Sequence, residues 1–140
     1  MTVQDGAIRF GPDLIVAVYR HQVEACAAAG PALLGGGTAP GEALSAWIDL
    51  FVDFLVTKHG LAEAMRSDQA SFQPLHDYFL ERLVPVCAAL LQAAAATRQV
   101  KPGIDALGLM FAVGNLCIGA HDPRYDPREM VHMLIADLAT

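Results

Sequence analysis

Histidine and glutamate stand three or four positions apart at three places in this sequence of 140 residues. On a helix this spacing puts both side chains on one face, and imidazole and carboxylate are both zinc ligands. The three pairs are His21 with Glu24, His59 with Glu63, and Glu129 with His132. Each pair offers two ligands where a catalytic zinc site usually has three. Surface or capping roles are therefore favoured, and no metal site is predicted.

Two carboxylates, Asp49 and Asp53, stand one helical turn apart. Paired acids of this kind divide acid and base roles when they face a pocket. A solvated helix edge is the favoured interpretation, because polar stripes on apolar helices usually face water. The sequence contains no nucleophile elbow, phosphate-binding glycine loop, HExxH or CxxC motif, so neither a catalytic residue nor a cofactor is predicted.

Both aspartates belong to residues 43–58, the most apolar stretch of the chain. Apolar residues around Trp47 recur at helical spacing, which predicts a central helix wrapped by the others. Polar residues form one narrow stripe on it, which faces either water or a cavity: Glu42, Ser45, Asp49 and Asp53. The aspartates interrupt the run, so no membrane span is predicted.

The composition indicates one helical domain in the cytoplasm. Hydrophobic residues make up 54% of the chain, and alanine and leucine, which favour helices, are prominent among them. The net charge is −6 and the basic residues are scattered, so no contact with nucleic acid is expected. Cys26, Cys87 and Cys117 are far apart among apolar neighbours, which indicates reduced core residues. No secretion signal is recognisable at the start of the sequence.

Proline and glycine mark the expected ends of the first helices. Pro12 opens a long helix, and Gly30 followed by Pro31 is expected to stop it. Gly60 is expected to end the central helix, and residues 61–67 are expected to form one short helix.

A long helix is expected over residues 72–98, where apolar residues keep a spacing of three or four. Pro85 removes one backbone donor in its middle, which predicts a kink. Kinks open space between packed helices, so we expect a cavity beside the polar groups of His76, Tyr78 and Arg82.

The aromatic side chains near this cavity suit either core packing or the walls of a pocket, and spacing alone favours the core. If they form a pocket, a small apolar or aromatic ligand fits it, with Arg82 or His76 orienting a polar end. The predicted ligand-binding residues are Trp47, Phe51, Phe54, His76, Tyr78, Phe79, Arg82 and Met110.

Two apolar helices are expected at the end of the chain, over residues 104–120 and 129–138. Asp126 and Pro127 are typical of the N-cap and the first-turn proline of a helix, and they stand just before residues 129–138. One small domain cannot easily cover both helices, so a homodimer with a four-helix contact is predicted. The predicted interface combines a small-residue face with an apolar stripe: Gly108, Ala112, Asn115, Gly119, Met130, Leu134 and Leu138.

Two runs of the sequence carry a resemblance to a known family. LIVAVYRHQVEA and EALSAWIDLFVDFLVTKHGLAEAMRSD resemble the C-terminal regulatory domain of TetR-type bacterial transcriptional regulators. The similarity covers nearly all of residues 14–138 and is most specific over residues 47–65. It implies an all-α antiparallel helical bundle, dimerisation through the last two long helices, and a ligand cavity among the first, central and kinked helices.

The sequence departs from the family pattern at its start. Residues 1–11 resemble a shortened remnant of the junction to a helix-turn-helix, which leaves residues 12–140 as a ligand-binding and dimerisation domain. DNA binding is therefore not carried over, and the leading hypothesis is a ligand-sensing, dimerising regulatory domain. One alternative is a small enzyme on the same scaffold that uses His76, Asp53 or Tyr78 as acid or base. Another is a partner that forms heterodimers with full-length regulators and antagonises them.

Overall fold

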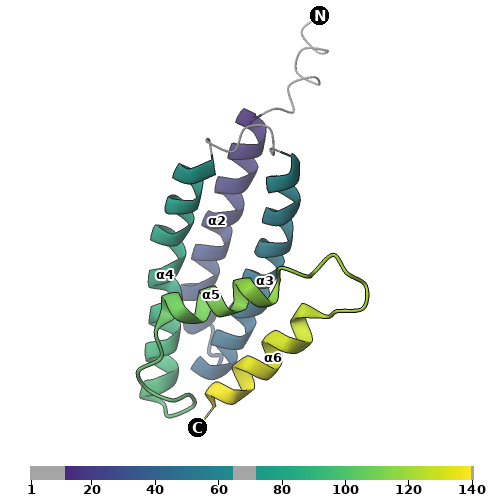
Figure 1. The fold of residues 1–140 in the computed structure, drawn as a ribbon. Helices are drawn as coiled ribbons and strands as arrows, with labels where there is room; N and C mark the ends of the chain where they lie inside the picture. Colours follow the sequence, from purple (N-terminus) through teal and green to yellow (C-terminus); the bar gives the residue numbers. More distant parts are fainter. Residues whose placement is uncertain (1–11, 65–71, 140) are drawn as a thin grey trace, which may run out of the picture.

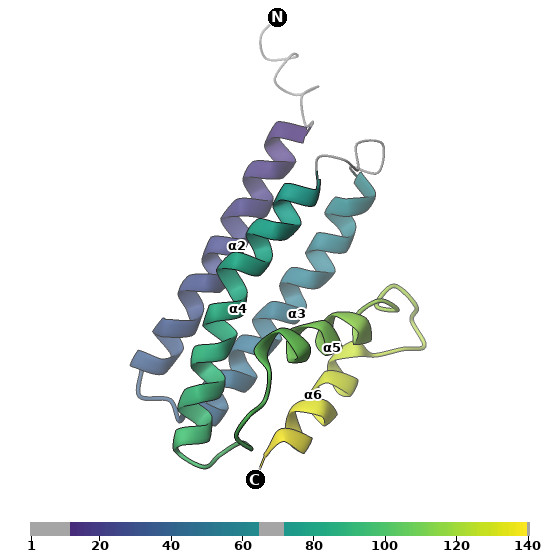
Figure 2. The ribbon, with the colours of Figure 1, turned by 60° about the vertical axis from the view of Figure 1, so that its left-hand side comes forward.

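The structure is a computed structural model that describes residues 12–64 and 72–139. Three long helices, α2 (Pro12–Gly35), α3 (Pro40–Ala64) and α4 (Phe72–Ala96), run up and down side by side (Figure 1). Two shorter helices, α5 (Ala106–Leu116) and α6 (Pro127–Leu138), cover the α3 and α4 side of this bundle, away from α2 (Figure 2). The predicted all-α fold is confirmed, with three long and two short helices among the described residues.

The expected stops inside the first two helices are wrong. The first helix continues through Pro31 to Gly35, and the central helix continues through Gly60 to Ala64. A glycine inside a helix costs only about 1 kcal/mol relative to alanine, and a buried apolar face outweighs that cost. Leu33 and Leu34, beyond Pro31, pack against the core and hold the end of α2 in place. The rest of the short helix expected over residues 61–67 lies outside the described residues.

The helix expected over residues 72–98 is α4, which ends at Ala96. Its sequence over Leu75–Ala96 is long and apolar enough to cross a membrane by length and composition alone. A core helix has the same properties, and α4 packs against α2, α3 and α5. Pro85 lies within the helix, and the kink predicted beside it stays a prediction.

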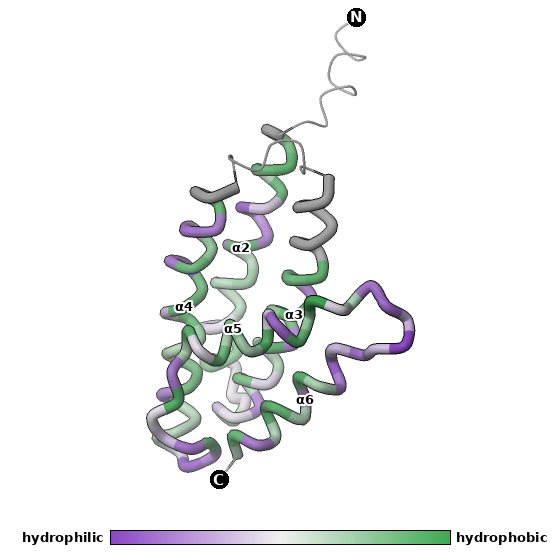
Figure 3. The backbone as a smooth tube through the Cα atoms, viewed as in Figure 1, coloured by the Kyte–Doolittle hydropathy of each residue, from purple (hydrophilic) through white to green (hydrophobic). Residues whose placement is uncertain are grey.

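The helix expected over residues 104–120 is shorter in the structure. The side chain of Asp105 caps the start of α5 by accepting a hydrogen bond from the backbone N–H of Gly108 at 2.7 Å. Turns replace the helix from Cys117 onward, and a largely hydrophilic connection leads to α6 (Figure 3). Asp126 accepts hydrogen bonds from the first turn of α6, so the predicted N-cap is confirmed.

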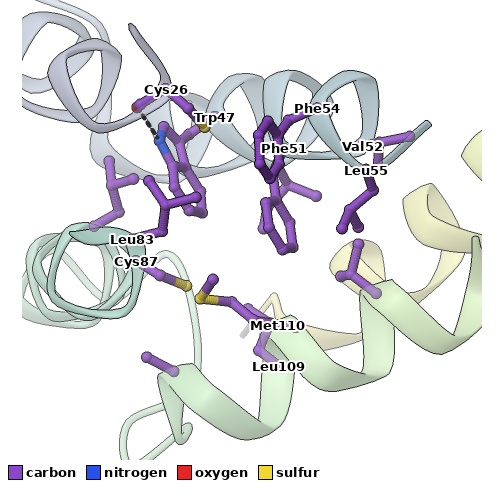
Figure 4. Close-up of a cluster of buried hydrophobic side chains, with 14 of the residues drawn as sticks. Cys26, Trp47, Phe51, Val52, Phe54, Leu55, Leu83, Cys87, Leu109 and Met110 are labelled. Atoms are coloured by element: carbon purple, nitrogen blue, oxygen red, sulfur yellow. Dashed lines mark hydrogen bonds between the residues drawn. The ribbon is translucent and has the colours of Figure 1, made fainter. Parts of the chain in front are cut away.

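The core is centred on α3, which contributes more buried apolar residues than any other described helix. Trp47 stacks on Phe51 at 5.5 Å between ring centroids, and Phe51 stacks on Phe79 of α4 at 5.9 Å. Met110 of α5 and Cys87 of α4 point toward one another beneath these rings (Figure 4). Burial raises the pKa of the Cys87 thiol to about 12, so this thiol stays protonated at neutral pH. All three cysteines are free and buried, as predicted from the sequence.

Candidate functional site

A cavity of about 390 Å³ lies between α3, α4 and α5. This volume is in the range that holds small organic ligands, about 300–1,000 Å³. Its walls are almost entirely apolar and are formed by Phe51, Leu55, His76, Phe79, Leu80, Met110, Phe111, Gly114, Asn115 and Ile118.

The inner wall of this cavity belongs to the rigid core, and the outer wall faces solvent. Phe51, Phe79 and Met110 are at most 4% exposed, and the rings of Phe51 and Phe79 stack on one another. Phe111 is 52% exposed and Ile118 is 61% exposed, so the mouth of the cavity is formed by apolar side chains that water also reaches. A lipophilic ligand can therefore enter past the outer wall and pack against an inner wall that is already formed.

Polar groups in the cavity are few. The imidazole of His76 lies 6.0 Å from the ring of Phe79, measured between ring centroids, and Asn115 stands on the opposite wall. Either side chain can exchange hydrogen bonds with one polar group of a ligand. The cavity thus suits a mainly apolar molecule with one or two hydrogen-bonding atoms.

Four of the eight predicted ligand-binding residues line this cavity, namely Phe51, His76, Phe79 and Met110. Trp47 and Phe54 lie one ring further inside, where they stack on Phe51 and Phe79 respectively. These two aromatic side chains support the cavity wall without lining it.

Tyr78 and Arg82, also predicted to bind the ligand, instead contact Glu24 of α2. The Arg82 guanidinium makes a two-pronged ion pair with this carboxylate, with Nε–Oε2 and Nη2–Oε1 distances of 2.8 and 2.6 Å, and the Tyr78 hydroxyl donates to the same carboxylate. Hydrogen bonds from Arg82 and Tyr78 lower the pKa of Glu24 to about 2. Arg20 covers the other side of the contact, with its guanidinium 5.2 Å from the Tyr78 ring centroid. This cluster ties α2 to α4.

Comparison with known proteins places the chain in a family. Residues 39–137 match the family model for the C-terminal domain of SbtR-like transcriptional regulators of the TetR type. The chain belongs to the TetR family. Its structure is similar to that of the TetR transcriptional regulator SCO0520 from Streptomyces coelicolor, with a TM-score of 0.77 and 26% sequence identity. The match covers 90% of this chain and 73% of that chain. No curated protein matches the sequence.

The polar stripe of the central helix faces the last helix of this TetR-family domain. Asp49 contacts His132 at 2.8 Å between Oδ1 and Nε2, and Asp53 pairs with Arg128. Beside these pairs, a groove of about 670 Å³ runs between the start of α3 and α6. The sequence left open whether this stripe faces water or a cavity; three of its members, Glu42, Ser45 and Asp49, line this solvent-accessible groove.

The three side chains named for an enzymatic alternative lie apart. His76 lines the cavity, Asp53 pairs with Arg128 of α6, and Tyr78 donates to Glu24 of α2. Of these three groups, His76 is the one that lines the cavity between α3, α4 and α5. Within residues 14–56 and 75–139, no three histidine, cysteine or acidic side chains are grouped closely enough to hold a metal ion.

The predicted dimer residues differ in what they contact. Gly108 lies against Asp105, and Gly119 lies against Tyr125. A side chain added at either glycine would therefore contact a residue of its own chain before it reached a partner chain. Leu134 and Leu138 pack partly against the core. Ala112, Asn115 and Met130 are partly or fully accessible.

Other large apolar side chains are exposed on α5, on the turn after it and on α6. Leu107, Phe111 and Ile118 form an exposed apolar surface along α5 and the turn after it, called here the α5 face. Met133 of α6 is 61% exposed. The spacing of four and seven residues along the α5 face is the sequence signal for it, and our prediction favoured the small residues beside it instead.

Proposed function

We propose that this chain is the ligand-sensing and dimerising regulatory domain of a TetR-family transcriptional regulator, acting in the cytoplasm. The observation that carries the proposal is the apolar cavity between α3, α4 and α5, whose inner wall is formed by the core. Membership of the family supports a regulatory role, since the matched family model describes the C-terminal domain of transcriptional regulators.

The ligand in this proposal is a small lipophilic or aromatic molecule. Phe51, Phe79 and Met110 supply aromatic and thioether surface, which packs well against flat apolar groups. His76 and Asn115 set the position of a polar end. Among the described residues that line the cavity there is no acidic or guanidinium side chain, so a neutral or weakly polar molecule is favoured over a strongly charged one.

Fluorescence of Trp47 tests the ligand site. Trp47 is the only tryptophan, and its ring stacks on Phe51, which lines the cavity. The neutral lipophilic dye N-phenyl-1-naphthylamine should quench Trp47 by energy transfer on binding, with saturation at one dye per chain.

Gly114→Leu is the variant that blocks the cavity, because Gly114 lines it and a Cβ there meets no atom within 4 Å. Dye binding should weaken about tenfold or more, equivalent to about 1.4 kcal/mol or more. Gly35→Leu is the matched control, since a Cβ at Gly35, at the end of α2, also meets nothing within 4 Å. Equal dye affinity in Gly114→Leu and the unmodified protein would contradict the proposed site.

The second part of the proposal is a homodimer that pairs the α5 faces of two copies. A chain with net charge −6 repels its own copy, but residues 106–120 contain no charged side chain. Leu107, Phe111 and Ile118 project from this uncharged segment, with Gly114 between the last two as a recess. A two-fold axis through such a surface brings large side chains against small ones.

Leu107→Lys tests this interface, because Leu107 is exposed and does not line the cavity. Sedimentation velocity should show a dimer for the unmodified protein and a monomer for Leu107→Lys at the same micromolar concentration. Leu14→Lys is the matched control, because Leu14 has similar exposure, 40% against 37% for Leu107. Leu14 lies at the start of α2, a helix that, among the described residues, does not contact α5. A dimer that survives Leu107→Lys would contradict the assignment of the α5 face.

A further inference from the structure

The mouth of the ligand cavity and the proposed dimer interface share two side chains. Phe111 and Ile118 line the cavity and are also the two most exposed members of the α5 face. A second copy that covers the α5 face must therefore cover the mouth of the cavity. In one copy alone, a ligand resting on Phe111 and Ile118 keeps part of its apolar surface in water.

We infer that the ligand site is complete only in the dimer, so that ligand binding and pairing of two chains strengthen each other. This inference rests on the proposed function and adds its regulation: the partner copy provides the outer wall of the cavity.

The physical basis is the apolar area buried at the mouth. Phe111 and Ile118 each gain contacts when a partner covers them, and a ligand held behind them loses its remaining exposure to water at the same time. A ligand that holds Phe111 in one rotamer also lowers the entropy cost of ordering that side chain in the interface. Both effects have the same sign, and they make the ligand bind the dimer more tightly than the monomer.

Thermodynamic linkage requires that dye binding and dimerisation strengthen each other to a matching extent. Coupling between two sites in proteins commonly changes affinity about 5- to 150-fold, and each ligand alters the other's binding by the same factor. N-phenyl-1-naphthylamine should therefore bind the dimer at least about fivefold more tightly than the monomer. Because each dimer contains two dye sites, the dye at saturation should strengthen dimerisation by the square of that factor, about 25-fold or more.

Leu107→Lys separates coupling from direct contact. Leu107 belongs to the α5 face but is absent from the cavity wall, so a lysine there should break the dimer and leave the residues around the dye unchanged. The dye is titrated into this variant, into Leu14→Lys as control, and into the unmodified protein from dilute to concentrated solution. Sedimentation velocity runs in parallel, and circular dichroism checks that each variant is folded.

The expected result is weaker dye binding in Leu107→Lys, by about fivefold or more, with Leu14→Lys equal to the unmodified protein. Dye binding that is equally tight in monomer and dimer, while Gly114→Leu still blocks it, would overturn the coupling and leave the proposed ligand site intact. A failure of the dye to bind the unmodified protein, or equal binding in Gly114→Leu, would overturn the ligand site and the coupling with it. A protein that is monomeric throughout would overturn the coupling and the proposed interface.

Discussion

The indole Nε1–H of Trp47 donates a hydrogen bond to the backbone carbonyl oxygen of Cys26 at 2.9 Å, inside the core. Trp47 lies on α3 and Cys26 on α2, so this bond fixes how far each helix is shifted along the other. It also satisfies the only polar atom of the largest buried side chain (Figure 4). The aromatic stack that forms the inner wall of the cavity begins at this ring.

Truncation of Trp47 should therefore separate packing from hydrogen bonding. Trp47→Ala should lower the free energy of unfolding by ~3–5 kcal/mol, as removal of a buried aromatic does. Trp47→Phe keeps a ring but leaves the Cys26 carbonyl without its indole donor, and should cost about 1–3 kcal/mol. Urea unfolding followed by circular dichroism measures both. Unchanged stability in Trp47→Ala would show that this helix is not the centre of the core.

Gly30 allows α2 and α4 to approach closely. A Cβ built at Gly30 would overlap Cγ1 of Val86, and a β-branched side chain on a helix has little rotamer freedom to move away. Gly30→Ala should destabilise the protein by about 1–3 kcal/mol, despite the better helix propensity of alanine. Adding Val86→Ala makes room for the new methyl group. The double variant should therefore be more stable, by about 1 kcal/mol or more, than the sum of the two single substitutions predicts. Strictly additive effects in urea unfolding would show that the two residues do not meet.

The sequence predicted the helical fold well because that prediction depends on many residues at once. The apolar periodicity around Trp47 and the capping side chain of Asp126 each produced the expected structure. The predicted helix ends at Gly30 and Gly60 were wrong because a single residue type decided them. Because Gly30 has no side chain, α2 can approach α4 closely at this point. The sequence alone does not show which helix lies against Gly30.

The residues that line the candidate cavity overlap only in part with those predicted from the sequence, for a related reason. The sequence indicates that Tyr78 and Arg82 share a helical face, but not which helix this face meets. In the structure it meets α2, where Glu24 stands opposite. His76 and Phe79 are a few positions away and meet α5 instead, so half of the predicted set lines the cavity. Crossing angles between helices decide such contacts, and sequence periodicity does not specify them.

The Glu24 cluster predicts an acid-dependent loss of stability. Hydrogen bonds from Arg82 and Tyr78 lower the pKa of Glu24 from 4.5 to about 2 in the folded chain. A lowered pKa means that the unfolded chain binds the proton first, so this contribution is complete above pH 4.5 and is lost as the pH falls toward 2. Glu24→Gln should be less stable than the unmodified protein at neutral pH, and the difference should shrink across that window.

Glu81→Gln is the matched control for this effect, because Glu81 lies exposed on α4, outside the cluster. Urea unfolding at a series of pH values measures the free energy of unfolding of each variant. A difference between Glu24→Gln and the unmodified protein that stays constant from neutral pH down to about 2 would contradict the ionic role of Glu24.

Tyr19 gives the last prediction, because its hydroxyl is buried without a hydrogen-bond partner in the described part of the chain. The residue is 4% exposed, its ring meets the edge of Phe54 at 5.5 Å between centroids, and burial raises the pKa of its hydroxyl. An unsatisfied buried hydroxyl costs about 1–3 kcal/mol, and phenylalanine keeps the ring while removing that cost. Tyr19→Phe should therefore leave the free energy of unfolding unchanged or raise it.

Tyr125→Phe is the matched control, because the Tyr125 hydroxyl donates to the carbonyl of Leu116 and its removal should cost about 0.5–1.5 kcal/mol. Urea unfolding of both variants decides the matter, and a loss in Tyr19→Phe as large as in Tyr125→Phe would show that the Tyr19 hydroxyl is hydrogen-bonded in solution.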